Sequence, residues 1–340
     1  MNVPAAEAED VDRAVRAARQ AFDDSPWSRL RPRERQNLLW RLADLMERDA
    51  RQLAELECLN NGKSAAVAQV MDVQLAIDFL RYMAGWATKI EGSTVEASMP
   101  LMPNDQFHGF VRREAVGVVG AIVAWNFPLL LACWKLGPAL ATGCTVVLKP
   151  ADETPLSVLK LAELVDEAGY PAGVFNVVTG TGLNAGAALS RHPGVDKLTF
   201  TGSTEVGKLI GKAAMDNMTR VTLELGGKSP TIVMPDANLQ EAAAGAATAI
   251  FFNQGQVVLC RVPPVRAPQA LRQRGGRHCR HRQRHEAGQR PGPCGADGPA
   301  DLGQAAGPRH RLHRAWPRGW ARPSPAVAKA SGRATSSSRR

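Results

Sequence analysis

The start of the chain carries hydrophobic residues at the spacing of amphipathic helices. This pattern predicts helices over residues 8–22, 34–58 and roughly 66–88, with the turn signal Asn61-Gly62 ahead of the third. We interpret these helices as packing elements, because no catalytic or ligand-binding pattern stands out in them.

From residue 116 onwards, short apolar runs alternate with segments of helical length. The runs predict buried strands over Val118–Ala124, Thr145–Leu148, Val174–Val178, Lys197–Phe200 and Val221–Leu223. The segments between them predict helices near 129–142, 155–168, 184–190 and 204–217. This alternation favours a parallel sheet with helices on both faces. Such sheets bind ligands at the carboxyl ends of their strands, so we expect the chemistry in the strand-to-helix turns.

The charge of the chain is concentrated at its C-terminal end. The 340 residues have a formal net charge of +10, but residues 257–340 alone hold 18 Lys and Arg against three acidic residues, a charge of +15. Residues 1–256 are therefore −5. The segment 257–340 contains no Ile, Phe, Tyr, Met or Asn, and is rich in Arg, Pro and Gly. Such a composition buries too little apolar surface to offset chain entropy, which predicts a disordered tail.

Several classes of protein are excluded or made less favourable by the sequence. No stretch reaches the roughly 18 uninterrupted apolar residues of a membrane helix. Residues 1–10 lack the basic and apolar regions of a signal peptide, so we expect a cytoplasmic protein. The net charge alone would favour a nucleic-acid partner. Because that charge lies in the tail, we expect only non-specific, salt-dependent binding.

The turn Phe200–Gly207 joins an apolar run to a helical segment. It places Gly202 and Gly207 five residues apart, with the hydroxyl of Ser203 between them. Small residues let a phosphate approach the backbone, and the N–H groups of a helix N-terminus favour an anion. The spacing is not the dinucleotide pattern G-x-G-x-x-G. A helix start with Ser203 as its N-cap is the alternative interpretation.

Two more turns carry polar residues directly after apolar runs. Asn126, in the turn Trp125–Pro128, can donate a hydrogen bond to a developing oxyanion; the alternative is an ordinary Asn before a Pro that starts a helix. Lys149 can hold a phosphate or a ribose hydroxyl, and Asp152 can accept from a ribose 2′-hydroxyl. A solvated, charged loop is the alternative interpretation there.

A lone acidic residue, Glu224, follows the run Val221–Leu223 and precedes two glycines. We expect it at a buried strand end, where burial would raise the pKa of its carboxyl and suit it as a general base. Paired acids at glycosidase-like positions, a Ser nucleophile elbow and a P-loop are all absent from the sequence.

Together these motifs resemble those of the aldehyde dehydrogenase superfamily. The matching segments, in the family's order and approximate spacing, are WNFP (125–128), LKPADETPL (148–156), FTGSTEVG (200–207), LELGGKSP (223–230) and FFNQGQ (251–256). The resemblance covers residues 1–256 and implies a Rossmann-like fold and NAD-dependent oxidation of an aldehyde to a carboxylic acid. It further implies an NAD-binding domain over 1–225, with part of a bridging hairpin near 93–115, and the start of a catalytic domain over 226–256.

The resemblance also implies a set of contacts with NAD. The residues so assigned are Trp125, Lys149, Asp152, Gly182, Gly202, Ser203, Gly207 and Leu225. Lys149 and Asp152 correspond to contacts with the adenosine ribose, where an acid disfavours the 2′-phosphate of NADP. Ser203 corresponds to the pyrophosphate contact, and Gly182 to the backbone that packs against adenine.

For catalysis, the resemblance implies that a cysteine thiolate attacks the aldehyde. Asn126 would stabilise the oxyanion, and Glu224 would activate the water that releases the acid. In the family, the nucleophile lies two residues after the Gln of FFNQGQ, a position that Val258 occupies here. Cys260 is the remaining candidate nucleophile, displaced by two residues. We therefore expect this chain to be inactive as it stands.

A change of reading frame explains the mismatch. One DNA sequence that encodes Leu259–Pro268 gives C-A-G-S-R-L-Y-V-H when its first base is dropped, which is similar to the family's continuation. We therefore interpret 257–340 as an out-of-frame tail, and the enzyme as truncated after Gln256. On this interpretation the segments for oligomerisation and for aldehyde recognition are missing. The zinc-like spacing of Cys279, His281 and His285 becomes a chance product, and no metal site is predicted.

Two other functions stay open. The chain could be a non-catalytic nucleotide-binding fragment, or a basic nucleic-acid-binding tail on a decayed enzyme domain. Cofactor binding with or without turnover separates the first from an active enzyme, and salt-sensitive DNA binding identifies the second.

Overall fold

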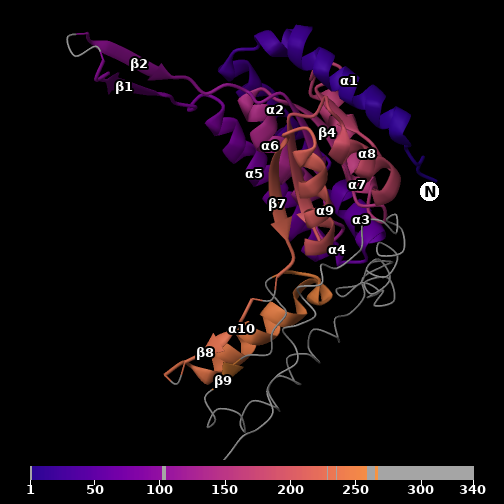
Figure 1. Ribbon diagram of the computed structural model, residues 1–340. Coiled ribbons are helices and arrows are strands. Elements are labelled where there is room, and N and C mark those ends of the chain that lie inside the picture. Colours follow the sequence, from indigo (N-terminus) through magenta and orange to yellow (C-terminus); the bar gives the residue numbers. More distant parts are fainter. Residues whose placement is uncertain (1, 102–104, 228, 235, 259–264, 267–340) are drawn as a thin grey trace, which may run out of the picture. The chain divides into compact units, whose positions relative to one another are not determined.

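The computed structural model describes residues 2–101, 105–227, 229–234, 236–258 and 265–266. It contains a five-stranded parallel sheet (Figure 1). The strands are β3 (Val118–Ile122), β4 (Thr145–Lys149), β5 (Phe175–Val177), β6 (Lys197–Gly202) and β7 (Arg220–Leu225). Each of them coincides with one of the five predicted apolar runs, so the predicted α/β class is confirmed.

The order of strands across this sheet is β5-β4-β3-β6-β7. The chain first builds outward from β3 through β4 to β5, and then returns to add β6 and β7 on the other side of β3. In β3, Val119 is paired with Val146 of β4 and with Lys197 of β6. The winding therefore reverses between β3 and β6, which is where open α/β sheets leave a crevice at the carboxyl ends of the strands.

Helices cover both faces of the sheet, as the sequence predicts. One face packs against α1, α8 and α9 through a cluster that includes Val118, Val147 and Leu198. The opposite face, with Val119 and Leu148, packs against α6 and α7, which α2, α3 and α5 cover in turn. The side chains of β3 and β4 alternate between these clusters, as the two-residue repeat of a strand requires. These helices are α1 (Ala8–Asp24), α2 (Pro32–Arg48), α3 (Ala50–Asn61), α5 (Leu75–Trp86), α6 (Pro128–Thr142), α7 (Leu156–Glu167), α8 (Ala187–Arg191) and α9 (Thr204–Met215).

The predicted helix over 34–58 is wrong in its continuity. The structure has two helices there, α2 and α3, which are separated at Asp49. The Asp49 carboxylate pairs with Arg48 at 2.7 Å and lies 3.6 Å from the ammonium of Lys160. Hydrophobic spacing continues through this break, so periodicity alone did not reveal it.

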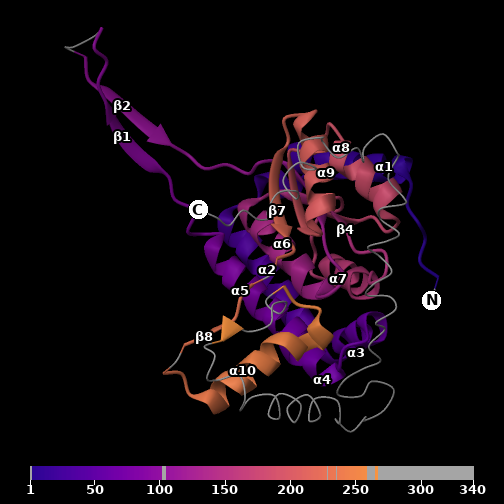
Figure 2. The same ribbon diagram turned by 60° about the horizontal axis from the view of Figure 1, so that its bottom comes forward.

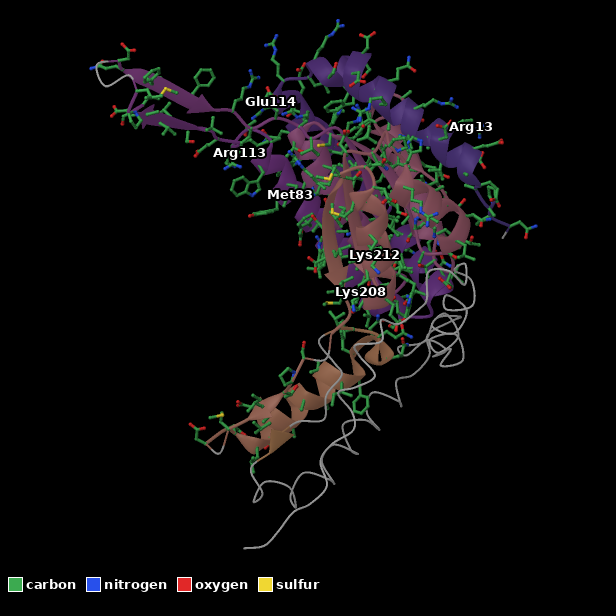
Figure 3. The ribbon with its side chains drawn as sticks, in the orientation of Figure 1. Arg13, Met83, Arg113, Glu114, Lys208 and Lys212 are labelled. Carbon is green, nitrogen blue, oxygen red and sulfur yellow. The ribbon has the colours of Figure 1, made fainter. Side chains whose placement is uncertain are left out.

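Helix α5 lies directly on α6. Gly137 of α6 faces the side chains of Met83 and Phe79, and a β-carbon at position 137 would lie 3.1 Å from Met83 (Figure 3). This close approach places α5 beside the helix that starts at the Trp125–Pro128 turn. The third predicted helix, near 66–88, corresponds to the short helices α4 (Ala65–Val67) and η2 (Ala68–Gln74) followed by α5.

Between α5 and β3 along the chain, two strands form a separate antiparallel hairpin. It is formed by β1 (Ser93–Ala97) and β2 (Phe107–Val111), and both views show it apart from the five-stranded sheet (Figures 1 and 2). It falls within the hairpin region expected near 93–115. Every residue of β1 is exposed.

The remaining elements are short, apart from one helix. They are η1 (Pro26–Arg29), η3 (Gly182–Gly186), β8 (Ile232–Val233), α10 (Leu239–Phe251), η4 (Phe252–Gly255) and β9 (Val265–Arg266). Strand β9 pairs in parallel with β8, although its two residues belong to the segment expected to be disordered. The rest of that segment, beyond Val258, lies outside the described residues. In the part of the chain that is described, no helix is long and apolar enough to cross a membrane.

The entry to β3 requires glycine at position 117. Gly117 has φ +121°, and a β-carbon there would overlap the carboxylate of Asp196. That carboxylate accepts from the backbone N–H of Val118 at 2.7 Å and pairs with Arg19 of α1. We expect Gly117→Ala to lower the free energy of unfolding by about 2 kcal/mol or more, from backbone strain and loss of this contact. Urea denaturation measures it.

Gly226→Ala is the matched control for this substitution, because Gly226 has open space around its β-position. A loss at Gly117 no larger than that at Gly226 would contradict the assignment.

Candidate active site

The predicted turns lie together at the carboxyl edge of the parallel sheet. The turn Trp125–Pro128 follows β3, and the turn at Ser203 follows β6, so they flank the point where the winding reverses. Lys149 ends β4, the other neighbour of β3. Because parallel strands have their carboxyl ends at one edge, the motifs at Asn126 and Ser203, far apart in sequence, follow adjacent strands.

The Trp125–Pro128 turn contacts the segment around Gln256, which contains the fifth sequence motif. The side-chain amide of Asn126 donates to the backbone carbonyl of Gln256 at 2.8 Å, and Asn253 donates to the carbonyl of Asn126 at 3.3 Å. The rings of Phe127 and Phe252 stack with centroids 6.4 Å apart. The amide expected to stabilise an oxyanion is thus half-buried and already donates a hydrogen bond.

Asn253 and Gln254 adopt left-handed backbone conformations, with φ 48° and 54°. Such conformations are uncommon for residues other than glycine and are maintained by the surrounding structure. Asn253 is buried, and its Oδ1 has no hydrogen-bond partner among the described residues. The strained segment therefore directs polar groups toward Asn126.

At the end of β4, Lys149 and Asp152 form an ion pair. Lys149 is almost fully buried, and its ammonium also donates to the carbonyl of Pro150 at 2.9 Å. The second oxygen of the exposed Asp152 accepts from the backbone N–H of Gly182 at 3.2 Å. The structure thus brings together three predicted contacts, from the end of β4, the loop after it and the start of η3.

The Ser203 side chain caps α9 by accepting from the N–H of Val206 at 3.2 Å. The capped-helix interpretation is therefore correct, and it is compatible with an anion at the same terminus. Gly207 is buried against β7, and a β-carbon there would overlap the side chain of Leu225. This glycine lets α9 approach the strand closely. Farther along α9, the exposed Lys208 and Lys212 lie one turn apart (Figure 3).

The expected burial of Glu224 is wrong. Glu224 lies in β7, which is an edge strand, and its side chain is exposed. It is opposite Thr201 in the pairing with β6. The sequence predicted the strand correctly, but the exposure of an edge strand depends on what packs beside it, which local pattern does not report. The argument that burial makes Glu224 a base therefore does not hold for this structure.

Lys135 of α6 is a candidate that the sequence pattern did not reveal. It is buried, and its ammonium donates to the hydroxyl of Thr199 in β6 at 3.0 Å. Burial lowers the pKa of Lys135 to about 8; the charge of Glu224 opposes this shift and that of Lys197 adds to it. A lysine within the apolar run of α6 is the signal that would have identified it.

A buried charged triad, Glu57, Lys63 and Asp72, also escaped the sequence interpretation. The Lys63 ammonium donates to Asp72 at 2.6 Å and lies 3.8 Å from Glu57. Burial raises the pKa of Asp72 to about 8; the charge of Lys63 lowers it and that of Glu57 raises it. The triad as a whole, one cation with two carboxylates, is thereby kept close to neutral at pH 7, because desolvation disfavours a net buried charge.

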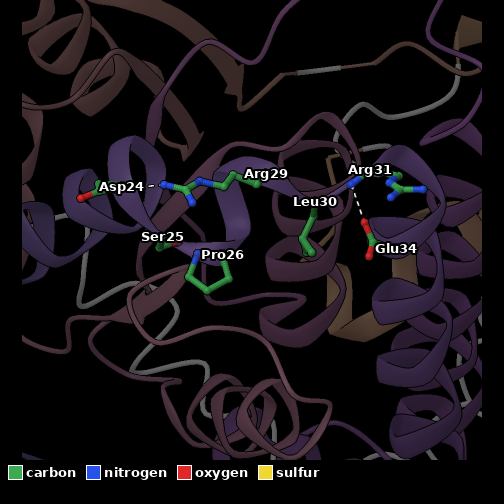
Figure 4. Close-up of a pocket in the computed structure, with 7 residues that line it drawn as sticks. All are labelled: Asp24, Ser25, Pro26, Arg29, Leu30, Arg31 and Glu34. Atoms are coloured by element: carbon green, nitrogen blue, oxygen red, sulfur yellow. Dashed lines mark hydrogen bonds and ion pairs between the residues drawn. The ribbon is translucent and has the colours of Figure 1, made fainter.

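The candidate nucleophile Cys260 lies outside the described residues. Val258, at the position where the family's nucleophile is expected, is described and is half exposed. Within the described ranges, no group of three His, Cys, Asp or Glu residues could hold a metal ion. A surface hollow between α1 and α2 involves none of the predicted site residues (Figure 4); it is lined by Asp24, Ser25, Pro26, Arg29, Leu30, Arg31 and Glu34.

Fold and site together match one known class of enzymes. The family model of the aldehyde dehydrogenase family matches residues 1–261. The chain therefore belongs to the aldehyde dehydrogenase family.

Individual relatives match the same part of the chain. Phenylacetaldehyde dehydrogenase of Pseudomonas fluorescens is 56% identical over 256 residues, covering 75% of this chain and 51% of the relative. Human mitochondrial aldehyde dehydrogenase is 53% identical over 250 residues, covering 73% and 47%. The NAD+ complex of an aldehyde dehydrogenase from Bacillus cereus has a TM-score of 0.72 and 49% identity, covering 75% and 51%. The chain thus spans about half the length of the relatives it matches.

The buried triad makes stability depend on pH. The folded-state pKa of Asp72, about 8, lies above the ordinary value of 3.8, so the folded chain binds more protons between these values. Stability from this group is therefore present at low pH and is lost as pH rises through 8. We expect the free energy of unfolding of the unmodified chain to fall relative to that of Asp72→Asn between pH 5 and 8.5, as measured by urea titrations.

Asp44→Asn provides the control, since Asp44 is an exposed partner of Arg81 at 2.9 Å. Curves for the unmodified chain and Asp72→Asn that stay parallel across this range would show that Asp72 does not titrate in the way described.

Proposed function

We propose that this chain binds NAD at the carboxyl edge of its sheet. By family, the complete reaction is the NAD-dependent oxidation of an aldehyde to a carboxylic acid, for which the cofactor would supply the hydride acceptor. The observation that carries the proposal is the cluster formed by Lys149, Asp152 and the N–H of Gly182, at the same edge of the sheet as the N-terminus of α9.

The residues at this edge fit a dinucleotide. An ammonium and a carboxylate side by side suit the hydroxyls of a ribose, and the backbone around Ser203 at the start of α9 suits a pyrophosphate. Both Asp152 oxygens already have partners, Lys149 and Gly182, so a ribose hydroxyl would share the carboxylate with them. Trp125 lies in the turn after β3 and Leu225 ends β7, so both residues start from the same edge of the sheet.

The catalytic part of the proposal is that this chain does not complete the reaction. Val258 stands where the family's nucleophile is expected, and its isopropyl side chain cannot attack an aldehyde. Asn126 would stabilise an oxyanion, but no such charge forms without a nucleophile. Glu224 and Lys135 could act on protons only after that step. On this proposal the chain retains the cofactor site of its family without the turnover.

Calorimetry with NAD, combined with an assay for aldehyde-dependent NADH, tests this proposal. We expect saturable NAD binding with one site per chain and no increase in absorbance at the wavelength of NADH. Phenylacetaldehyde is a suitable probe, because one relative is named for it. NADH formation at a rate proportional to protein would overturn the inactive assignment, and absence of NAD binding would overturn the proposal as a whole.

The charge of Asp152 provides a test of cofactor choice. A carboxylate near the adenosine 2′-position repels the 2′-phosphate of NADP, so we expect the unmodified chain to favour NAD. Asp152→Asn keeps the shape of the side chain but removes its charge. We expect it to lower the ratio of the NADP dissociation constant to the NAD dissociation constant by about tenfold. Asp166→Asn is the control, because Asp166 lies at the far end of α7. Equal ratios in all three proteins would contradict the assignment of Asp152.

A further inference from the structure

The end of α3 contacts two loops that carry candidate residues. These are the turn Trp125–Pro128 after β3 and the loop 150–155 between β4 and α7. The contacts come from the side chains of Asn60, Asn61 and Lys63. Parallel pairing aligns the strands but does not fix loops beyond their ends, so other contacts must hold these loops.

Both polar atoms of the Asn60 side-chain amide form hydrogen bonds with the loop after β4. Its Nδ2 donates to the carbonyl of Glu153 at 2.7 Å, and its Oδ1 accepts from the N–H of Leu156 at 2.8 Å. Leu156 is the first residue of α7, and the residue before it is Pro155, whose side chain makes no capping hydrogen bond. Asn60 therefore caps α7 from another helix and closes the loop that contains Asp152.

The turn after β3 is held at two successive carbonyls. Asn61 donates to the carbonyl of Trp125 at 2.6 Å, and the Lys63 ammonium donates to the carbonyl of Asn126 at 2.9 Å. The same ammonium lies 4.3 Å from the ring centroid of Phe127. These carbonyls belong to the peptide planes on either side of the Asn126 α-carbon, so fixing both sets the direction of the Asn126 side chain.

The buried triad supports this arrangement, because its member Glu57 bonds to the helices that follow the two loops. Glu57 accepts from the N–H of Leu129 at 3.1 Å, near the start of α6, and from the hydroxyl of Ser157 at the start of α7. Its carboxylate therefore lies at two helix N-termini, where the helix dipoles favour a negative charge. The helices that follow the two loops are thus joined through one side chain, which in turn neighbours Lys63.

We propose that Asn60, Asn61 and Lys63 are positioning residues that hold the Trp125–Pro128 turn and the 150–155 loop in one fixed arrangement, so that both sides of the cofactor cleft are presented together. The value of this arrangement for NAD rests on the proposed function. Preorganisation of this kind strengthens binding, because the loops lose less freedom when the ligand arrives.

The first test measures the loops themselves, without ligand, by hydrogen–deuterium exchange of the full chain. In Asn60→Ala the N–H of Leu156 loses its acceptor, and we expect faster exchange at residues 153–160. Asn60→Asp keeps an acceptor for Leu156 and should retain that protection. Asn61→Ala should accelerate exchange in the peptide that contains Asn126 and Leu129.

The matched control is Asn217→Ala. The side chain of Asn217 donates to the carbonyl of Arg191 at 2.8 Å, so it makes the same kind of bond away from these loops. It should leave exchange in both loops unchanged. Lys63 is kept in all variants, because its removal would leave two buried carboxylates without a cation. Unchanged exchange in Asn60→Ala and Asn61→Ala would overturn the inference, whatever the chain binds.

The second test is calorimetric titration with NAD. We expect Asn60→Ala and Asn61→Ala each to weaken binding about fivefold, the change that corresponds to one net hydrogen bond, while Asn217→Ala binds like the unmodified chain. Faster exchange with unchanged affinity would show that the residues do not position the cofactor cleft and would overturn the inference. If the unmodified chain binds no NAD, the proposed function fails, and the exchange experiment alone decides whether these residues hold the loops.

Discussion

The parallel pairing of β3 with both β4 and β6 is the constraint from which the candidate site follows. Because all three strands run in the same direction, the residues that leave them, Asn126, Lys149 and Ser203, start from one edge of the sheet. Strands β3 and β4 are buried on both faces by separate apolar clusters, and β6 contributes Leu198 and Phe200 to one of them. The hydrophobic effect therefore fixes the sheet, and the sheet brings polar residues together that no local interaction would gather.

The sheet, however, sets only where the loops begin. Their course is determined by polar groups at the end of α3 and just after it, above all Asn60 and Lys63, and by the segment that follows α10, which accepts from Asn126. Most of these bonds use backbone carbonyls or N–H groups of the loops, so they depend on geometry more than on the loop sequence. Polar bonds of this kind, most of them partly buried, have value mainly because leaving one partner unsatisfied is costly.

Much of the fold could be predicted from local sequence, since buried parallel strands are continuous apolar runs and the helices between them are amphipathic. The break at Asp49 could not, because the hydrophobic pattern of α2 passes into α3 unchanged. The exposure of Glu224 was mispredicted because it depends on β7 being at the edge of the sheet. Lys63 and Asp72 lie nine positions apart in different elements, so their pairing appears only when the chain is folded. Motifs identified the residues at the edge, whereas the network that supports them required tertiary structure.

A cofactor site and a catalytic site make different demands on a polypeptide. Apart from Trp125, the proposed NAD contacts come from the ends of β4, β6 and β7, the loop after β4, η3 and the start of α9, on elements that the two apolar clusters anchor. The side-chain amide of Asn126, the proposed oxyanion donor, instead donates to Gln256, and its turn packs on Phe252, so its environment is completed by residues after α10. Binding chemistry can therefore persist on the sheet when the sequence after Gln256 departs from the family's pattern. On the proposed function catalysis does not persist, because a nucleophile must be held within a fraction of an ångström of its place, and Val258 occupies the position at which the family's nucleophile is expected.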